Sequence, residues 1–350
     1  MSEGSRTSTR LLSFTEISKA LSCQAQWDFA YGGHLAGSAL SPKMVAPRLS
    51  GGRAWGAAVA AFHTEHAAGA AIEAMDRSLD SDAAEQKDLG VYDGASHKEL
   101  RLELLHLLNH YVHIAEPWDL DPRLERELLI PIPSRTGVRS SNRYKLLCYL
   151  DGTRQINGQH WIVEFKLRGA LSSVEQIALS RQIRYYAWAW WQATGIMPTG
   201  VEVHEKLNQV PKPPRMVQGR KRTDAPLVPS HAKDQLCTAE AYEDACAEHE
   251  VEVNEATLES LKTRKWHQVV PIIFRAGELE EAGRELVSAA QLIQDLDSGK
   301  LWPVRNAWPG NCRGCFFREI CPAPDNDLVD ALYIREPPKR EREEHASPST

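Results

Sequence analysis

Two carboxylates and a lysine stand close together near the middle of the chain, at Asp151, Glu164 and Lys166. Between them, the Asn157-Gly158 pair is a strong signal for a hairpin turn. It joins an apolar run that ends before Asp151 to a second run that contains the Glu-x-Lys pair. Because successive side chains on a strand alternate between its faces, Glu164 and Lys166 point the same way. The spacing therefore predicts that all three charged side chains converge at the edge of a sheet.

Such a group of side chains could bind a metal ion and act on a phosphate. Two carboxylates can hold a hard divalent cation through oxygen ligands. A neighbouring lysine can orient a water molecule or stabilise charge that develops on a phosphate. A Glu-x-Lys pair on its own is more often a surface ion pair, so other features of the chain must distinguish the two interpretations.

The cysteines give a second signal. Three of them follow a Pro- and Gly-rich stretch near the C-terminus, at Cys312, Cys315 and Cys321. This close spacing is typical of ligands to a soft metal, and such a site needs a fourth ligand. Cys23 is the main candidate, although a small buried residue is the simpler interpretation of Cys23 alone. Cys148 is expected in the core, while Cys237 and Cys246 flank an acidic helix and are less plausible ligands.

Composition limits the kind of protein. The 350 residues are 42% hydrophobic and carry a net charge of -6, which suits one large or two smaller globular domains. No apolar run is long enough to span a bilayer, and the polar N-terminus does not resemble a signal peptide, so we expect a cytoplasmic protein. An odd cysteine count favours metal ligands or free thiols over disulfides. Binding of nucleic acid would need a local basic patch.

Helical and strand patterns alternate along the chain. The expected helices cover residues 13–31, from 53 onward, 96–115, 173–194, 238–262 and 276–298. The expected strands cover residues 124–131, 144–150, 161–166, 199–206 and 266–274. In the fourth helix, Gln182 and Tyr186 are four residues apart and share one face, while its aromatic stripe is more typical of core packing. In the helix from residue 53, His63 is a candidate metal ligand, and Glu65 and His66 are expected on a solvated face.

These patterns divide the chain into segments. They are a disordered tail (1–10), a helical part (11–120), a central strand-rich core (121–207), a basic Pro-rich loop (208–230), a helix-strand-helix segment that completes the core (231–300), a cysteine segment (301–325) and a charged tail (326–350). The loop at 208–230 is either a flexible excursion or a surface that contacts phosphates. On the strand before the hairpin, Glu127 either reaches the carboxylate site or forms an ion pair with an arginine.

Together these residues resemble the PD-(D/E)XK nuclease superfamily, over about residues 11–322. In that family an Asp ends one strand, Glu-x-Lys lies on the next, and Gln-x-x-x-Tyr follows on a helix. Asp151, Glu164 with Lys166, and Gln182 with Tyr186 match this order. The resemblance implies an α/β fold with a central mixed β-sheet flanked by helices, in a restriction-endonuclease-like core.

The branch that the chain resembles most is the RecB-like exonucleases that contain iron and sulfur, including AddB-type domains, CRISPR-associated exonucleases and their phage relatives. In this branch an N-terminal cysteine and a Cys-x2-Cys-x5-Cys group hold a 4Fe–4S cluster. The resemblance implies that Cys23, Cys312, Cys315 and Cys321 do so here. Zinc at the same cysteines is the alternative.

One family feature departs from the pattern. The family has a histidine four residues after a helical glycine, and counted from Gly56 that position is Ala60. His63 follows one helical turn later and is expected either to replace the missing imidazole or to leave the metal with one fewer ligand. An imidazole ligand would make Mn²⁺ more plausible beside Mg²⁺.

The resemblance implies a metal-dependent DNA exonuclease that acts on single strands or ends. Asp151, Glu164, the Phe165 carbonyl and His63 would hold Mg²⁺ or Mn²⁺, while Lys166, Gln182 and Tyr186 would position water or phosphate. Protein partners in recombination or CRISPR adaptation are possible under this reading. The alternatives are a DNA-binding protein with a degenerate site and a zinc-stapled scaffold that binds no nucleic acid.

Overall fold

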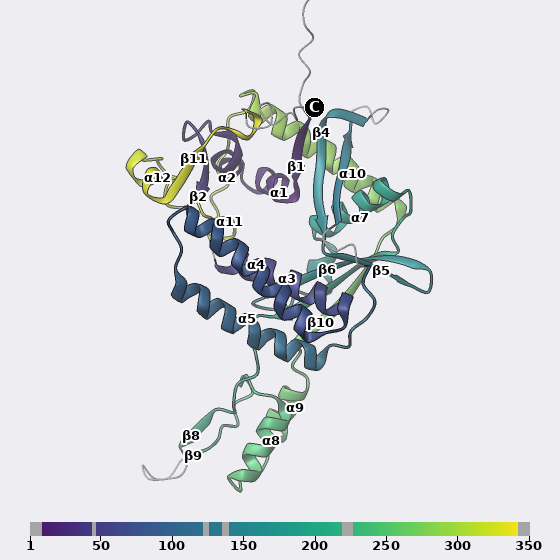
Figure 1. Cartoon of the computed structure of the whole chain (residues 1–350), viewed down its shortest axis with the longest axis vertical. Coiled ribbons are helices and arrows are strands. Elements are labelled where there is room, and N and C mark those ends of the chain that lie inside the picture. The colour runs from purple at the N-terminus through teal and green to yellow at the C-terminus, as the bar shows by residue number, and fades with distance from the viewer. Residues whose placement is uncertain (1–8, 44–46, 122–125, 135–139, 219–226, 342–350) are drawn as a thin grey trace, which may run out of the picture.

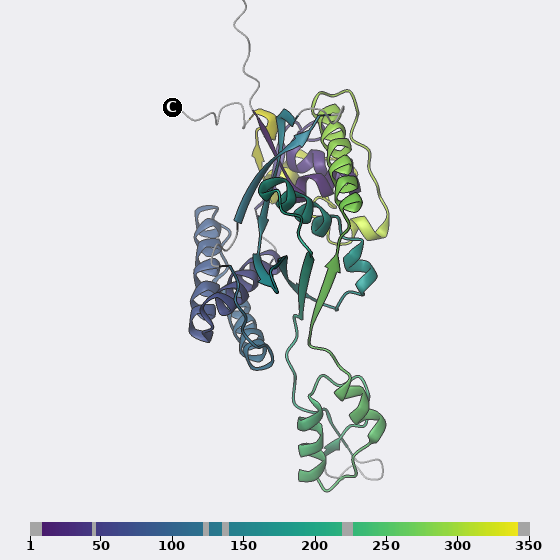
Figure 2. The ribbon, with the colours of Figure 1, turned by 90° about the vertical axis from the view of Figure 1, so that its right-hand side faces the viewer.

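The computed structural model describes residues 9–43, 47–121, 126–134, 140–218 and 227–341. Over these residues the fold is mixed α/β, with helices packed around two central sheets and a small module that projects from them (Figures 1 and 2). No described helix is both long and apolar enough to cross a membrane.

The larger sheet carries the Glu-x-Lys strand. Its order is β10-β7-β6-β5, and its strands are β5 (Gly152–Ile156), β6 (Gln159–Arg168), β7 (Gly200–Leu207) and β10 (His267–Ile273). β5 and β6 form a hairpin at the predicted Asn157-Gly158 turn, and β6 pairs with β7 in parallel. Asn157 (φ 51°) and Gly158 (φ 78°) both have positive φ, as a two-residue type I′ turn requires.

The second sheet has three strands in the order β1-β4-β3: β1 (Arg10–Ser13), β4 (Ser140–Leu150) and β3 (Arg126–Pro133). The sequence predicts that the apolar run at 146–150 is the hairpin partner of β6, and this is wrong. That run belongs to β4, and the partner of β6 is the more polar β5. Arg10 was expected in a disordered tail but lies in β1, which pairs with β4 in parallel.

Helices cover the sheets on two sides. One group packs with residues of both sheets into the largest core: α6 (Val174–Ala178), α7 (Arg181–Thr194) and α10 (Ala276–Asp297). The other group packs over Val163 and Phe165 of β6: α3 (Pro47–Glu65), α4 (Ala68–Asp88) and α5 (Gly94–Ile114). The sequence predicts a helix from residue 53 onward, whereas α3 begins at Pro47 and α4 follows it as a separate helix. The aromatic stripe of α7 is buried in the core, as predicted.

Two predicted helices are interrupted. The helix expected over residues 13–31 stops after α1 (Phe14–Ser22) because Cys23 adopts an extended conformation; α2 (Gln24–Trp27) and the π-helix η1 (Asp28–Gly32) follow. The helix expected over residues 173–194 divides at Leu179 and Ser180 into α6 and α7. The second break places Ser180 as the N-cap of α7, two residues before Gln182.

The two ends of the chain share a small lobe. β2 (Ala39–Pro42) pairs with β11 (Tyr333–Glu336). Before β11 the chain forms α11 (Pro309–Cys312) and α12 (Asn326–Leu332). An aromatic core that includes Phe29, Phe317 and Tyr333 holds the lobe together. The described part of the segment at 326–350 is therefore not a tail but a folded part of this lobe.

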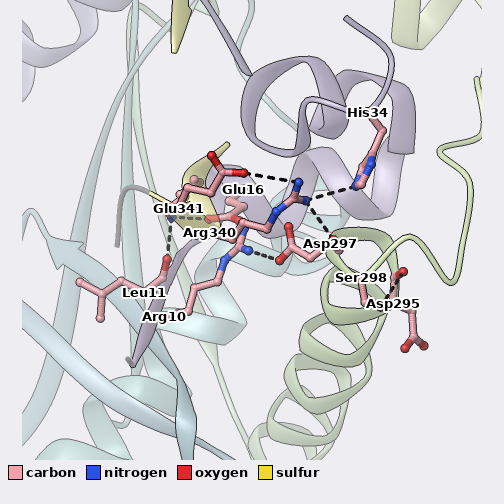
Figure 3. A network of polar contacts seen from close by, with 10 residues as sticks. Arg10, Leu11, Glu16, His34, Asp295, Asp297, Ser298, Arg340 and Glu341 are labelled. Carbon is pink, nitrogen blue, oxygen red and sulfur yellow. Dashed lines mark hydrogen bonds and ion pairs between the residues drawn. The ribbon is translucent and has the colours of Figure 1, made fainter. Parts of the chain in front are cut away.

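A network of charges attaches the lobe to the second sheet (Figure 3). Arg10 forms ion pairs with the buried Glu16 and with Asp297 at the end of α10. Lys339 also pairs with Glu16 and donates to the carbonyl oxygen of Leu11 at 2.6 Å. Since Lys339 follows β11 and Glu16 lies on α1, these contacts hold both ends of the chain beside β1.

A separate module interrupts the pair formed by β7 and β10. It consists of β8 (Met216–Gln218), β9 (Leu227–Pro229), α8 (Ala239–Glu248) and α9 (Glu255–Lys262), and it has its own small core. Figures 1 and 2 show that it extends away from the rest of the molecule. The helix predicted over residues 238–262 is wrong as a single helix, since it divides into α8 and α9. The loop predicted over residues 208–230 is irregular through Arg215, but it contains β8 and β9. The segment at 231–300 completes the core only through β10 and α10.

Candidate active site

Asp151 and Glu164 meet where the chain passes between the sheets. Asp151 follows the last residue of β4 and precedes β5. Its Oδ2 atom accepts a hydrogen bond of 2.8 Å from the backbone N–H of Phe165. Since Phe165 stands between Glu164 and Lys166 on β6, this bond fixes Asp151 beside the Glu-x-Lys pair. The three charged side chains therefore lie together.

A series of polar contacts joins β6 to α7. Lys166 forms an ion pair with Glu164 Oε1, and its Nζ donates a 3.2 Å hydrogen bond to Gln182 Oε1. Gln182 Nε2 donates to Glu164 Oε1 at 2.9 Å and to the Tyr186 hydroxyl at 3.0 Å. Gln182 and Tyr186 are one helical turn apart, so both side chains face β6. The structure thus brings together Asp151 and these four predicted residues.

Neighbouring carboxylates keep Lys166 charged. Burial lowers the pKa of Lys166, but attraction by Glu164 and Asp151 outweighs burial, and the pKa lies above its usual value. The Lys166 side chain is 25% exposed and that of Glu164 only 2%, so Lys166 is the more exposed member of the pair. Burial, and then the charge of Glu164, raise the pKa of Tyr186, which remains a neutral hydroxyl.

The donor atoms of this site fit a hard divalent cation. Glu164 Oε2 is buried and has no hydrogen-bond partner among the described residues. A buried carboxylate oxygen without a partner is costly unless a cation or water reaches it. Asp151 and the carbonyl group of Phe165 add further oxygen donors, the type that Mg²⁺ and Mn²⁺ take. Within the described ranges no three His, Cys, Asp or Glu side chains form a group that could hold a metal ion.

His63 lies apart from these carboxylates. Its Nε2 atom is 2.9 Å from the Tyr111 hydroxyl, and its ring stacks on Trp118 with centroids 4.2 Å apart. It also lies parallel to the ring of Phe165, whose side chain points to the opposite face of β6 from Glu164. This arrangement does not support the prediction that His63 adds an imidazole ligand to the site.

His63 belongs instead to a group of buried histidines. The ring centroids of His63 and His204 on β7 are 6.4 Å apart. Those of His204 and His267 on β10 are 5.9 Å apart. Burial, reinforced by neighbouring histidines and by Arg154, lowers the pKa of His63 to about 3. Burial, with His204 and Lys206, lowers that of His267 to about 4. All of these imidazoles are therefore neutral in the folded protein at pH 7.

This group predicts a loss of stability in weak acid. The unfolded histidines have pKa values near ~6.5, so below that pH the unfolded chain binds more protons than the folded one. The free energy of unfolding should then fall by about 1.4 kcal/mol per pH unit for each such histidine between about pH 6 and 5. Urea unfolding at pH 7.5, 6 and 5 measures this slope. His63→Phe should reduce the slope by the contribution of about one proton, or about 1.4 kcal/mol per pH unit. An equal slope in both proteins would contradict the conclusion that His63 is a buried neutral imidazole.

The four predicted cluster cysteines line one cavity. Its volume is about 400 Å³, and Cys23, Cys312, Cys315 and Cys321 all contribute to its wall. Burial raises the pKa of Cys315, and the proximity of the other three sulfur atoms raises it further. All four are free thiols that face the same cavity. Four cysteine thiolates are the donor set of a four-iron cluster, and zinc takes the same set.

Other predicted residues lie elsewhere. Cys148 is buried in the main core, as predicted. Cys237 and Cys246 are buried in the core of the projecting module and do not face the cysteine cavity. Among the described residues, Glu127 contacts neither the carboxylate site nor an arginine. Its Oε2 accepts a 3.0 Å hydrogen bond from the Tyr149 hydroxyl. Glu65 and His66 are exposed, as predicted.

The basic loop is only partly described. Residues 220, 221 and 222, which are three of its five basic residues, lie outside the described residues. Lys206 precedes the loop and is buried at the end of β7, where its Nζ donates to the carbonyl oxygens of Leu207 and Gln209. Arg215 pairs with Asp234 inside the module. The phosphate-contacting interpretation of this loop remains a prediction.

Comparison with known families agrees with the site. The model of the PD-(D/E)XK nuclease superfamily matches residues 11–322, which is most of the chain. The chain belongs to the PD-(D/E)XK nuclease superfamily. No curated protein matches it.

Two solved structures are similar to this PD-(D/E)XK chain at low identity. SSO0001 is 14% identical with a TM-score of 0.31, over 71% of this chain and 82% of that one. A candidate exonuclease from Eubacterium rectale is 11% identical with a TM-score of 0.36, over 86% and 90%. Both TM-scores are too low to support an argument about function, so the family match carries the assignment.

Two charged residues beside the site of this PD-(D/E)XK chain, Arg168 and Glu205, were not predicted from the sequence. Arg168 continues the alternation of Glu164 and Lys166 on β6, so the period of two could have identified it. Glu205 on β7 is the strand partner of Lys166, and only the register of the sheet reveals that position.

Proposed function

We propose that this chain is a metal-dependent DNA exonuclease of the iron–sulfur type. The observation that supports it best is the contact series from Asp151 through Glu164, Lys166 and Gln182 to Tyr186. A surface ion pair, the simpler interpretation of Glu-x-Lys, does not require a fully buried glutamate or a glutamine that bridges both members. Members of a nuclease superfamily with such a site are expected to hydrolyse phosphodiester bonds.

The protein side chains divide the work by charge. Asp151, Glu164 and the Phe165 carbonyl would hold Mg²⁺ or Mn²⁺, which supplies a water of lowered pKa and offsets charge on the phosphate. Lys166 is a cation on a partly exposed side chain, and it would contact a phosphate oxygen or the attacking water. Gln182 fixes the orientation of Lys166, and Tyr186 fixes Gln182.

The cysteine cavity has a structural role in this proposal. Cys23, Cys312, Cys315 and Cys321 would hold a 4Fe–4S cluster, which supplies a cross-link between the two ends of the chain. The cavity contains no group of the carboxylate site, and its wall comes from the lobe formed by both termini. The cluster would therefore stabilise the fold and would not take part in hydrolysis.

One observation favours a second candidate, a DNA-binding protein without catalysis. The family histidine position is occupied by Ala60, and His63 does not reach the carboxylates. The site then offers one fewer protein ligand for the metal.

The test uses anaerobically purified full-length protein and end-labelled single-stranded and duplex DNA. Degradation is expected with Mg²⁺ or Mn²⁺, and none is expected in EDTA. The product ladder then reports polarity and strand preference. Metal-independent degradation would contradict the mechanism, and a folded protein that binds DNA without cleaving it would leave the second candidate.

A further inference from the structure

A third charged residue extends the row formed by Glu164 and Lys166. Arg168 is two residues beyond Lys166 on β6, so its side chain leaves the same face of the strand. Two strand residues span about 6.6 Å, a separation similar to that between neighbouring phosphates of an extended single strand. The positive charge of Arg168 acts on Lys166, which shows that the two cations are near each other.

A buried carboxylate holds Arg168 in place. Glu205 lies on β7, its side chain is 0% exposed, and its Oε1 accepts from Arg168 Nε at 3.1 Å. Glu205 also accepts from the backbone and hydroxyl of Ser172 at 2.7 and 2.8 Å, and from Gln268 Nε2 at 2.9 Å. Burial alone would raise the pKa of Glu205, but these donors and Arg168 lower it, so the carboxylate is ionised.

The contact leaves the end of the guanidinium group accessible. The bond to Glu205 uses Nε, and the Arg168 side chain is 45% exposed. An arginine fixed through Nε presents its terminal N–H groups in a planar fork, a geometry that suits phosphate oxygens. An arginine that served only to neutralise Glu205 would not need this exposure.

We propose that Arg168 binds the phosphate next to the one that is cleaved, and that Glu205 is the positioning residue that orients it. This inference rests on the proposed nuclease function. It also means that the bound DNA strand runs along β6. Lys166 then contacts the scissile phosphate and Arg168 its neighbour. The site would therefore recognise a DNA strand by two successive phosphates and not by its bases.

The test measures binding of a fluorescein-labelled 20-nucleotide single strand in EDTA over a series of salt concentrations. Arg168→Ala should weaken binding about ten-fold. It should also reduce the slope of log affinity against log salt by about 0.7, the change expected when one single-strand phosphate contact is lost. Arg168→Lys should keep the slope and recover part of the affinity, because it retains the charge but not the fork. Arg53→Ala is the matched control, since Arg53 is also exposed and paired with a carboxylate, Asp82.

The role of Glu205 is tested by a double-mutant cycle. Glu205→Gln should raise KM, and Arg168→Ala combined with Glu205→Gln should be no worse than Arg168→Ala alone, because Glu205 acts through Arg168. Additive effects would overturn the positioning role. Wild-type affinity and slope in Arg168→Ala would overturn the phosphate contact while leaving the nuclease proposal intact. Absence of both DNA binding and cleavage in the wild-type protein would overturn the proposed function as well.

Discussion

Lys166→Ala is expected to lower the rate of DNA hydrolysis by about 10²–10³-fold, the usual effect of removing one preorganised electrostatic contact to a transition state. Lys166 is the more exposed charge of the Glu164–Lys166 pair, and its raised pKa keeps it protonated throughout the neutral range. Glu164→Gln should have an effect at least as large, because it weakens the metal site directly. Initial rates on end-labelled DNA at saturating Mn²⁺ measure both.

The same substitution has a second expected consequence. In the absence of metal, Lys166 is the cation paired with Glu164, whose side chain is 2% exposed. Removing it leaves a buried carboxylate without its counter-ion, so the melting temperature of Lys166→Ala in EDTA should fall. Mn²⁺ should restore more stability to this variant than to the wild-type protein, because the cation then replaces the missing charge.

An exposed lysine provides the control. Lys98 lies on the exposed side of α5, and Lys98→Ala should leave both the rate and the metal response unchanged. A Lys166→Ala protein that is folded and as active as this control would show that Lys166 is only the partner of Glu164 in a surface ion pair. Loss of activity without any change in the metal response would indicate that the metal binds elsewhere.

The candidate site was more predictable from the sequence than the fold around it. Glu164, Lys166, Gln182 and Tyr186 are placed by local periodicity, which is two on a strand and 3.6 on a helix. Any regular strand and helix at those positions bring each pair to one face. The position of Asp151 depends only on its place at the end of a strand next to the hairpin. It was therefore predicted correctly, although the strand before it was assigned to the wrong sheet.

Features that depend on long-range pairing were not accessible. The choice of β5 over β4 as the partner of β6 depends on how the chain turns at Asp151, because Asp151 borders both strands. His63 is one helical turn from Ala60, yet the packing of α3 on Phe165 directs it away from Glu164. Arg10 and Lys339 hold the two ends of the chain through ion pairs with Glu16. Local composition predicts tails at both ends, because these ion pairs join segments far apart in the sequence.

Cys23→Ser is expected to remove a brown chromophore and to destabilise the protein by about 3–5 kcal/mol, the range for losing a cross-link that closes a long loop. Cys23 separates α1 from α2, while Cys312, Cys315 and Cys321 lie close to the other end of the chain, so a cluster in their cavity constrains nearly the whole sequence. Absorbance near ~400 nm in anaerobic protein reports the cluster, and thermal unfolding reports the stability. A colourless wild-type protein that contains zinc would contradict this assignment.

Cys148→Ala separates the effect of the cluster from that of a lost buried cysteine. Cys148 is in the main core and outside the cavity, so its replacement should cost stability but keep the colour.

Activity should distinguish a structural cluster from a catalytic one. α1 connects Cys23 to β1, and β1 pairs with β4, which ends just before Asp151. Loss of the cluster would therefore displace this carboxylate only when the lobe unfolds. Cys23→Ser should therefore lose activity in proportion to its unfolded fraction, and cooling should restore both together. A folded, colourless and inactive variant would instead give the cluster a direct part in the reaction.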